Sequence, residues 1–223
     1  MIFDGKAFAE EILNNLPRKK AKLAVFLDPN NTSGARYVKI KTEVAKRLGV
    51  EIVMNRIGGD EDGIMVQLPH PDSQKLISQI PPEKDVDGLR EDSPYLPAVV
   101  RASKEVLLSL QEDLLQKRMV IVGSSGFVGK NLMKLYPNAI GMDKEDFDPE
   151  KIKTFDIVIS ATGSPNLIKD IKKGAICIDL GFPKGDFDPG CNRKASFFTP
   201  VPGGVGPVTV ACLFENLLIK YSH

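Results

Sequence analysis

The chain has 223 residues, with 30 lysines and arginines against 29 aspartates and glutamates and a formal net charge of +1. That length suffices for one large domain or two small lobes. The even charge balance argues against a nucleic-acid-binding protein, which needs a basic surplus on one face. A hydrophobic fraction of 42% with 26% charged residues is ordinary for a globular chain and excludes disorder as the main state.

The sequence also bears on the compartment. No apolar run approaches the roughly 20 residues of a membrane-spanning helix, and the early charges of Asp4 and Lys6 are unlike a signal peptide. Three cysteines, odd in number and without a C-x-x-C pair, are typical of a reducing cytosol. The two histidines argue against a His-rich metal site. We expect a soluble cytoplasmic protein, and no metal is implied.

Helices and strands alternate from the start of the chain. Apolar residues at helical spacing predict a helix within 3–16, and a β-type run predicts a strand at 22–27. A second helix is expected at 35–48, where Gly49 ends it. Its expected apolar stripe consists of Tyr37, Ile40, Val44 and Leu48.

Two further strands are expected at 50–54 and 63–67, which makes this region the start of a parallel α/β sheet. The residues between them, 55–62, are too few for the usual crossover helix. Eight extended residues still span about 26–29 Å. We therefore expect a bare loop to make the crossing.

The second half of the chain predicts a Rossmann-like parallel sheet. A long helix at 98–116 leads into it, and a strand at 118–122 runs into a glycine loop at 123–129 and a helix at 129–135. Further strands are expected at 139–142, 156–160, 175–180 and 196–198.

The predicted fold is α/β with two lobes that are discontinuous in sequence. A last helix at 207–221 is expected to fold back on the first lobe. The first lobe therefore comprises residues 1–100 and 207–223, and the second comprises residues 101–206.

The glycine loop is a candidate phosphate-binding turn. Small residues let the backbone approach a phosphate, and the N–H groups that open the next helix carry partial positive charge. The G-x-x-G-x-x-G spacing differs from the Rossmann G-x-G-x-x-G, so a tight turn without a ligand is the alternative. Two later strands also end in small residues, at Thr162-Gly163 and at Gly181. A dinucleotide crevice at the carboxyl ends of parallel strands requires such turns.

Tyr37 and Lys41 are four residues apart and share a face of the second helix. A Tyr-x-x-x-Lys pair also occurs in short-chain dehydrogenases, but there it follows the cofactor loop, whereas here it precedes the loop by roughly eighty positions. Spacing alone favours an ordinary solvated lysine, since Lys39 and Lys46 lie nearby.

Three further segments carry polar or rigid residues. Gln67 ends a buried strand before a proline-rich turn, so its amide would face a cleft. Asp85 and Asp87 flank a valine and point to the same side if the segment is extended; either could be a metal ligand, a hydrogen-bond acceptor or a turn residue. Three prolines and three glycines within 199–207 fix one rigid loop, and Pro207 starts a helix.

Together these motifs resemble one family. Tyr37-x-x-x-Lys41, Val66-Gln-Leu-Pro69, Lys84-Asp-Val-Asp-Gly88, the glycine loop and the loop at 199–207 occur in one order and with suitable separations. In that order they resemble bifunctional methylene-tetrahydrofolate dehydrogenase/methenyl-tetrahydrofolate cyclohydrolases. The resemblance spans nearly the whole chain, and the last motif is highly specific.

The resemblance implies two lobes around a cleft, with folate in the first lobe and NADP on the second. It implies oxidation of methylene-tetrahydrofolate to the methenyl form, followed by hydrolysis to formyl-tetrahydrofolate, in one-carbon metabolism. A homodimer is expected by the same analogy.

Roles for the polar residues of the first lobe follow from the resemblance. Lys41 is similar to the family's central acid/base group, and its pKa is expected to lie below the reference of about 10.4. Gln67 looks like its partner, and Tyr37 resembles the tyrosine that stacks on the aminobenzoate ring. Asp87, rather than Asp85, matches the aspartate that accepts hydrogen bonds from the pterin. The rigid loop would close the substrate site through Pro202, Gly203 and Gly204.

The resemblance also assigns cofactor residues. Gly123-Ser-Ser125 matches the family's Gly-x-Ser at the phosphates, and Phe182 stands at the nicotinamide end. Many relatives carry arginine in place of Ser124, where it can hold the 2′-phosphate of NADP, and a carboxylate such as Asp143 usually favours NAD. The resemblance favours NADP, and NAD stays open. The expected set is Gly123, Ser124, Ser125, Gly126, Val128, Gly129, Asp143, Thr162, Gly163 and Phe182.

Departures from the family pattern keep alternatives open. The chain is shortened at 55–62 and before the connector helix, and Gly34 stands where the family has serine. One alternative is an enzyme that retains only one of the two activities. Another is a dinucleotide-binding sensor with a degenerate folate lobe, although the joint presence of Lys41, Gln67 and Asp87 speaks against decay. A structural interaction protein is least favoured, because it would not require the rigid loop.

Overall fold

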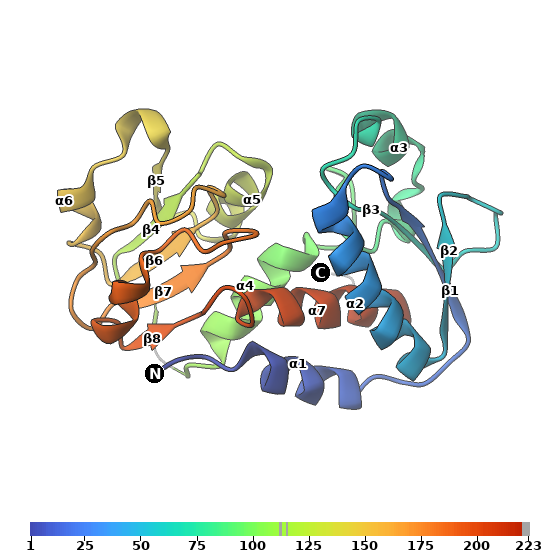
Figure 1. Cartoon of the computed structure of the whole chain (residues 1–223), viewed down its shortest axis with the longest axis horizontal. Coiled ribbons are helices and arrows are strands. Elements are labelled where there is room, and N and C mark those ends of the chain that lie inside the picture. Colours follow the sequence, from blue (N-terminus) through green and yellow to red (C-terminus); the bar gives the residue numbers. More distant parts are fainter. Residues whose placement is uncertain (112, 115, 220–223) are drawn as a thin grey trace. The chain divides into compact units, whose positions relative to one another are not determined.

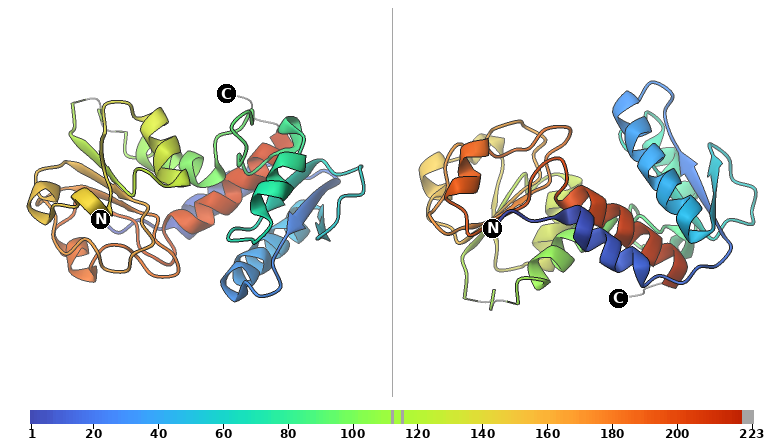
Figure 2. Two further views of the ribbon diagram at one scale, coloured as in Figure 1. Left: turned by 90° about the horizontal axis from the view of Figure 1, so that it is seen from above. Right: turned by 60° about the horizontal axis from the view of Figure 1, so that its bottom comes forward.

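The computed structural model describes residues 1–111, 113–114 and 116–219. It divides the chain into two compact units, each with one sheet (Figures 1 and 2). We call them the three-stranded unit (residues 10–98 and those from 210 onward) and the five-stranded unit (residues 1–9 and 99–209). The chain passes from one unit to the other within α1 (Gly5–Asn14), at the start of α4 (Ala98–Leu108) and within α7 (Val205–Ile219).

The first nine residues belong to the five-stranded unit, although the sequence placed them with the other lobe. The Phe3 amide donates to the Phe198 carbonyl (2.9 Å), and the Phe198 amide donates to the Met1 carbonyl (3.0 Å). The Phe3 ring also packs on the Phe197 ring, with centroids 5.4 Å apart. This pairing joins residues almost two hundred positions apart, so no local pattern reveals it.

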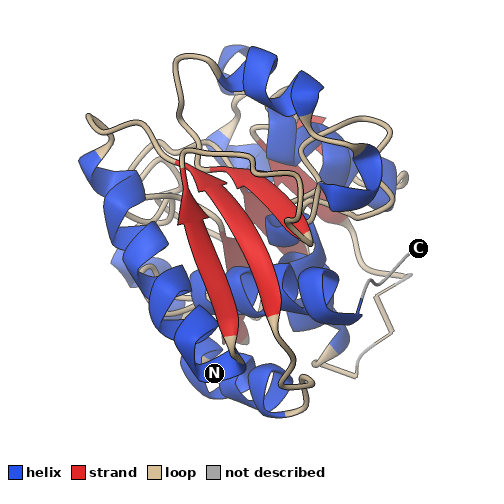
Figure 3. Cartoon of the chain, turned by 90° about the vertical axis from the view of Figure 1, so that its right-hand side faces the viewer, coloured by secondary structure: helices blue, strands red, loops and turns tan. Residues whose placement is uncertain are grey.

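The three-stranded unit contains a parallel sheet with the strand order β2-β1-β3. Its strands are β1 (Ala21–Phe26), β2 (Val50–Met54) and β3 (Gly63–Val66), and Figure 3 shows them running in one direction. The predicted strands are confirmed to within one residue. All four residues of β3 are buried, and two of them, Ile64 and Val66, form a core cluster with Ala24 and Ile80.

The connection from β2 to β3 crosses β1 as a bare loop, as predicted. Residues 55–62, all of them described, form no helix. The buried Glu61 carboxylate accepts hydrogen bonds from the amides of Gly58 and Gly59, the latter at 2.9 Å. The Lys22 amide donates to Asp62 Oδ2 (2.9 Å), so the end of the loop is tied to β1.

The five-stranded unit contains a parallel sheet with the strand order β5-β4-β6-β7-β8. The order reverses between β4 and β6, which is where ligands bind in open α/β sheets. Every residue of β4, β6 and β7 is buried. The strands confirm the predicted positions: β4 (Met119–Val122), β5 (Ile140–Met142), β6 (Ile157–Ser160), β7 (Ile176–Asp179) and β8 (Phe197–Phe198).

The helices agree less closely with the sequence. The connector helix α4 ends at Leu108 rather than at 116. The amides of Leu110 and Gln111 bond to carbonyls three residues earlier, and Gln111 takes a left-handed φ of 52°. Helix α7 begins two residues before Pro207, which its first turn tolerates; predicted positions 220 and 221 lie outside the described residues. The remaining helices are α2 (Thr32–Leu48), α3 (Ser73–Gln79), α5 (Phe127–Leu135) and α6 (Pro149–Ile152), with short 3₁₀ turns at Pro82–Lys84, Lys144–Asp146 and Pro189–Arg193.

None of the helices among the described residues combines the length and the apolar character that a membrane span requires.

Candidate active site and dinucleotide site

Helix α2 carries Lys41 on its buried face. The Asn31 side chain accepts from the Gly34 amide (2.7 Å) and caps the start of the helix, and Gly49, with φ +77°, ends it. The buried residues recur at helical spacing: Gly34, Val38, Lys41, Ala45 and Leu48.

The observed stripe therefore differs from the predicted one, because Ile40 is 50% exposed and Lys41 is only 7% exposed. The alternative of a solvated Lys41 is wrong. Packing of α2 against the sheet decides which face is buried, and the spacing of apolar residues did not reveal it. Tyr37, one turn before Lys41, is half-buried, and burial raises the pKa of its hydroxyl.

The Lys41 ammonium has a partner at the end of β3. Lys41 Nζ donates to Gln67 Oε1 at 2.8 Å, and Gln67 Nε2 donates to the carbonyl of Leu68 at 3.1 Å. Gln67 directly follows β3, the strand whose residues are all buried. The amide oxygen therefore faces the amine, and the geometry brings together two residues that the sequence placed 26 positions apart.

Burial sets the ionisation of this site. Loss of water lowers the pKa of Lys41, and the nearby negative charge of Asp87 opposes that shift. Burial likewise raises the pKa of Asp87, to about 6, against the attraction of Lys41 and with the repulsion of Asp85. Burial therefore lowers the pKa of the amine and raises that of the carboxyl, so both shifts favour the neutral forms.

Asp85 and Asp87 have different surroundings. Asp85 is fully buried, and its Oδ2 accepts from the Arg90 amide (2.8 Å), while its Oδ1 has no hydrogen-bond partner among the described residues. Asp87 is half-buried and interacts with Lys41. Gly88, with φ +67°, turns the chain directly after Asp87, where a Cβ would lie 2.6 Å from the Leu96 backbone. Asp85 therefore holds the loop, and the charge of Asp87 acts on the amine.

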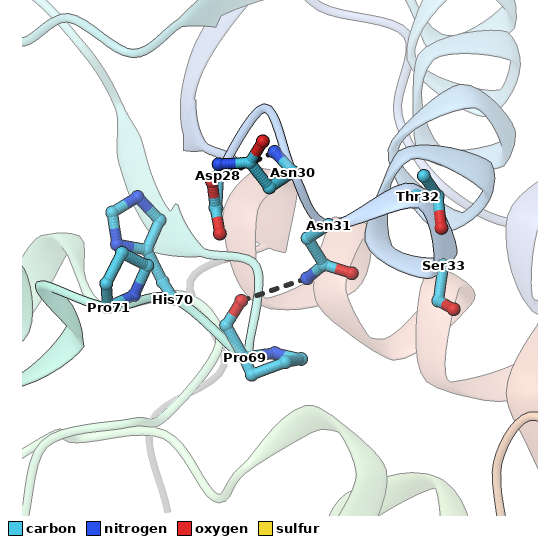
Figure 4. Close-up of a pocket in the computed structure, with 8 residues that line it drawn as sticks. All are labelled: Asp28, Asn30, Asn31, Thr32, Ser33, Pro69, His70 and Pro71. Atoms are coloured by element: carbon cyan, nitrogen blue, oxygen red, sulfur yellow. Dashed lines mark hydrogen bonds between the residues drawn. The ribbon is translucent and has the colours of Figure 1, made fainter.

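A pocket of about 450 Å³ lies at the carboxyl ends of β1 and β3, beside the start of α2 (Figure 4). Asn31 Nδ2 donates to the Pro69 carbonyl across it at 2.9 Å. The lining residues differ from the candidate catalytic residues: Asp28, Asn30, Asn31, Thr32, Ser33, Pro69, His70 and Pro71.

The glycine loop after β4 packs tightly against its own backbone and against the turn after β6. Gly123 has φ +86°, and a Cβ there would lie 2.8 Å from the Ala161 carbonyl oxygen on the turn after β6. A Cβ on Gly129 would lie 2.0 Å from the Gly123 oxygen. Only glycine allows these approaches, so the backbone of Gly123–Gly129 packs closely where the strand order reverses. Gly126 caps α5 without a side chain, and Val128 lies in the first turn.

Asp143 directly follows β5 and is bound to this loop. Its carboxylate accepts hydrogen bonds from Ser124 Oγ (2.7 Å), Ser125 Oγ (2.9 Å) and the Ser125 amide (3.0 Å to Oδ1). The Ser124 bond, followed by the two from Ser125, lowers the pKa of Asp143 against the effect of burial. The structure thus joins three of the expected cofactor residues into one cluster.

Two buried aspartates, which the sequence did not assign, hold the turns after β6 and β7. Asp186 Oδ2 accepts from Ser160 Oγ (2.7 Å) and from the Thr162 amide (2.8 Å). Asp179 Oδ1 accepts from the amides of Gly181 (2.9 Å) and Asp186 (3.0 Å). The position of Asp179 at the end of a strand is a signal that the sequence contains. Asp186 gives no such signal, because its partners lie 24 and 26 positions away.

The other expected residues lie on these turns and on the rigid loop. Gly163 has φ +62°, and Phe182 is 40% exposed. In the rigid loop, which includes Pro202, the Gly204 amide donates to the Pro200 carbonyl (2.8 Å) and the Gly5 amide donates to the Gly203 carbonyl (3.0 Å).

Comparison with known proteins gives concordant results. The model of the tetrahydrofolate dehydrogenase/cyclohydrolase family, NAD(P)-binding domain, matches residues 97–223. The bifunctional protein FolD of Hydrogenobaculum sp. (strain Y04AAS1) is 37% identical over 274 aligned positions, covering 100% of this chain and 99% of that protein. The alignment is longer than the chain, so the chain lacks positions that this relative has.

Two solved structures are similar along nearly the whole chain. The methylenetetrahydrofolate dehydrogenase-cyclohydrolase (FolD) of Trypanosoma brucei, complexed with NADP and an inhibitor, has a TM-score of 0.85 and 26% identity. The 5,10-methylenetetrahydrofolate dehydrogenase of the silkworm Bombyx mori has a TM-score of 0.81 and 28% identity. Each similarity covers 98% of this chain and 96% of the other.

Proposed function

Because the chain belongs to the tetrahydrofolate dehydrogenase/cyclohydrolase family, we propose that it oxidises methylene-tetrahydrofolate to the methenyl form and hydrolyses that form to formyl-tetrahydrofolate. The observation that carries the proposal is the buried amine of Lys41, held 2.8 Å from Gln67 Oε1 and close to the charge of Asp87. A purely structural helix would not place an amine there, because burying an ammonium costs free energy.

Lys41 acts as the acid/base group. In the hydrolysis a water molecule adds to the methenyl carbon and loses a proton, and a ring nitrogen gains a proton as its bond to that carbon breaks. An amine whose pKa is lowered by burial can accept the first proton and return one to the nitrogen. Gln67 holds the amine in place through its oxygen, and Asp87 accepts hydrogen bonds from the pterin. Tyr37 stacks on the aminobenzoate ring.

The glycine loop, the turns after β6 and β7 and Phe182 hold the dinucleotide. When bound, NAD(P) supplies the nicotinamide carbon that accepts the hydride of the oxidation. Within Gly123–Gly129 the amides that open α5 bind the pyrophosphate, and Thr162, Gly163 and Phe182 position the nicotinamide end. Pro202, Gly203 and Gly204 contact the substrate.

Absorbance-monitored turnover tests the proposal with Lys41→Ala and the matched control Lys39→Ala, an exposed lysine of the same helix. Loss of the acid/base group is expected to lower the rate of ring opening by about 10²-fold or more, while Lys39→Ala keeps it. An undiminished cyclohydrolase rate in Lys41→Ala would remove Lys41 from the central role.

The same assays separate the alternatives. Measuring the dehydrogenase and the cyclohydrolase independently detects an enzyme that retains one activity. A dinucleotide-binding sensor would bind NAD(P)H but no folate analogue in a titration.

The proposed setting is the cytoplasm, and the proposed assembly is a homodimer. The three cysteines are odd in number and form no C-x-x-C pair, which is typical of a reducing compartment. The homodimer rests on analogy with the family, and light scattering on the purified protein tests it.

A further inference from the structure

The end of β5 carries a carboxylate where a dinucleotide fold distinguishes its two common cofactors. Asp143 stands about twenty residues after the glycine that opens the phosphate loop, the distance at which an acidic residue binds the ribose hydroxyls of NAD. The loop and the strand end are also joined by their backbones, because the Gly123 and Ser124 amides donate to the Met142 carbonyl at 2.8 and 3.4 Å. The placement of Asp143 beside the dinucleotide loop is therefore fixed by the sheet itself.

The side chains of Ser124, Ser125 and Asp143 form a hydrogen-bonded cluster. Ser124 Oγ donates to Asp143 Oδ2, and the Ser125 hydroxyl and amide donate to Oδ1. Gly141 leaves space for this cluster, since a Cβ at that position would lie 2.7 Å from Ser124 Oγ. The carboxylate also takes part in a capping box with the Asp146 backbone, so several contacts fix its orientation. The side chain is half-buried, so a ribose hydroxyl can reach it.

The hydrogen bonds of this cluster favour the charged form of the Asp143 carboxylate, which forms no ion pair with a described residue. The serine hydrogen bonds hold the pKa of Asp143 below its usual value. Lys130 and Lys144 are exposed, and neither forms an ion pair with Asp143 within the described part of the chain. A 2′-phosphate would thus meet a fixed negative charge, whereas a 2′-hydroxyl would meet an acceptor.

We propose that Asp143, held by Ser124 and Ser125, makes this protein bind NAD(H) in preference to NADP(H). The inference rests on the proposed function, since it concerns the dinucleotide of that same reaction. It assigns Asp143 as the residue that determines which dinucleotide is used.

Equilibrium titration tests the inference independently of turnover. The full-length protein is titrated with NADH and with NADPH, and the emission of the reduced nicotinamide gives the two dissociation constants; the chain contains no tryptophan that would interfere. NADH is expected to bind about tenfold or more tightly than NADPH. Repulsion between the Asp143 carboxylate and the 2′-phosphate at close range is expected to weaken NADPH binding by at least that factor. Asp143→Asn should reduce that ratio to about threefold or less.

A matched variant controls for the loss of a negative charge. Glu145→Gln removes a charge from an exposed side chain two residues away and should leave the ratio unchanged. The wild-type ratio is decisive even if Asp143→Asn fails to fold. NADPH binding as tightly as NADH, or an unchanged ratio in folded Asp143→Asn, would overturn the inference while the proposed function stands. A protein that binds neither dinucleotide would overturn both.

Discussion

At the scale of single residues, Lys41 and Asp87 are each shifted toward the neutral form by burial and toward the charged form by the other. Burial is the larger effect in both cases, so the pKa of Lys41 lies below its usual value and that of Asp87 rises to about 6. A lysine on the surface would stay protonated at neutral pH. Burial therefore gives this amine the ability to take and return a proton, and the nearby carboxyl limits how far its pKa falls.

The raised pKa of Asp87 predicts that the contribution of this residue to stability falls as pH rises from about 4 to about 6. In the unfolded chain the carboxyl loses its proton near its model value of 3.8, whereas the folded protein keeps the proton up to about pH 6. The folded state binds more protons over this window, so the free energy of unfolding decreases with pH. Asp87→Asn should remove a decline of roughly 2–3 kcal/mol, measured by urea unfolding at a series of pH values.

The control for this prediction is Asp72→Asn, which removes an exposed carboxylate from the same unit. Its unfolding free energy should keep the wild-type pH dependence. Equal flattening in both variants would show that general charge, and not the buried carboxyl, causes the decline.

At the scale of elements, Asn31 joins the start of α2 to the segment that leaves β3. Its Oδ1 accepts from the Gly34 amide (2.7 Å), and its Nδ2 donates to the Pro69 carbonyl (2.9 Å). One amide thereby links the helix of Lys41 to the segment of Gln67. Asn31→Ala should lower the free energy of unfolding by about 1–2 kcal/mol, because it removes a cap and a hydrogen bond.

Asn31→Asp separates the two roles, since it keeps the acceptor for Gly34 but loses the donor to Pro69. It should retain most of the stability and still lower the cyclohydrolase rate. Asn30→Ala, at an exposed neighbour, is the control and should change neither. A cyclohydrolase rate in Asn31→Asp equal to that of the wild type would contradict the link between the helix and the strand.

The elements also show which features a sequence can predict. Strands were placed to within about a residue because short apolar runs bounded by turn residues are local signals. Helix α3 gave no such signal, since none of its described residues is buried. The end of α4 was missed because Leu110 and Leu114 continue the helical spacing past the left-handed Gln111.

In the candidate site, too, local features could be predicted from the sequence and long-range contacts could not. The spacing of Tyr37 and Lys41 and the position of Gln67 at a strand end are local, and the sequence singled them out. The burial of Lys41 depends on how α2 packs on the sheet, and the role of Asp186 depends on partners more than twenty positions away. Such long-range contacts decide ionisation and loop position, and periodicity does not encode them.

At the scale of the whole molecule, the five-stranded unit is built from two separate segments of the chain, residues 1–9 and 99–209. Residues 1–9 add to the unit at β8, although residues 10–98 of the other unit separate them from its remaining sequence. Phe3, 9% exposed, packs between the rings of Phe8 (5.5 Å) and Phe197 (5.4 Å). The start of the chain therefore acts as part of the dinucleotide-binding sheet.

Phe3→Ala tests this arrangement because it removes a buried ring and leaves the backbone pairing possible. It should lower the free energy of unfolding by about 3 kcal/mol, whereas Ile2→Ala, at a side chain 52% exposed, should change it by about 0.5 kcal/mol at most. Hydrogen–deuterium exchange of Phe3→Ala should show faster exchange at residues 1–9 and 196–199 and unchanged exchange in β1 to β3. Equal acceleration in both sheets would show that Phe3 stabilises the two units alike, and the assignment of residues 1–9 to the five-stranded unit would then lose its energetic basis.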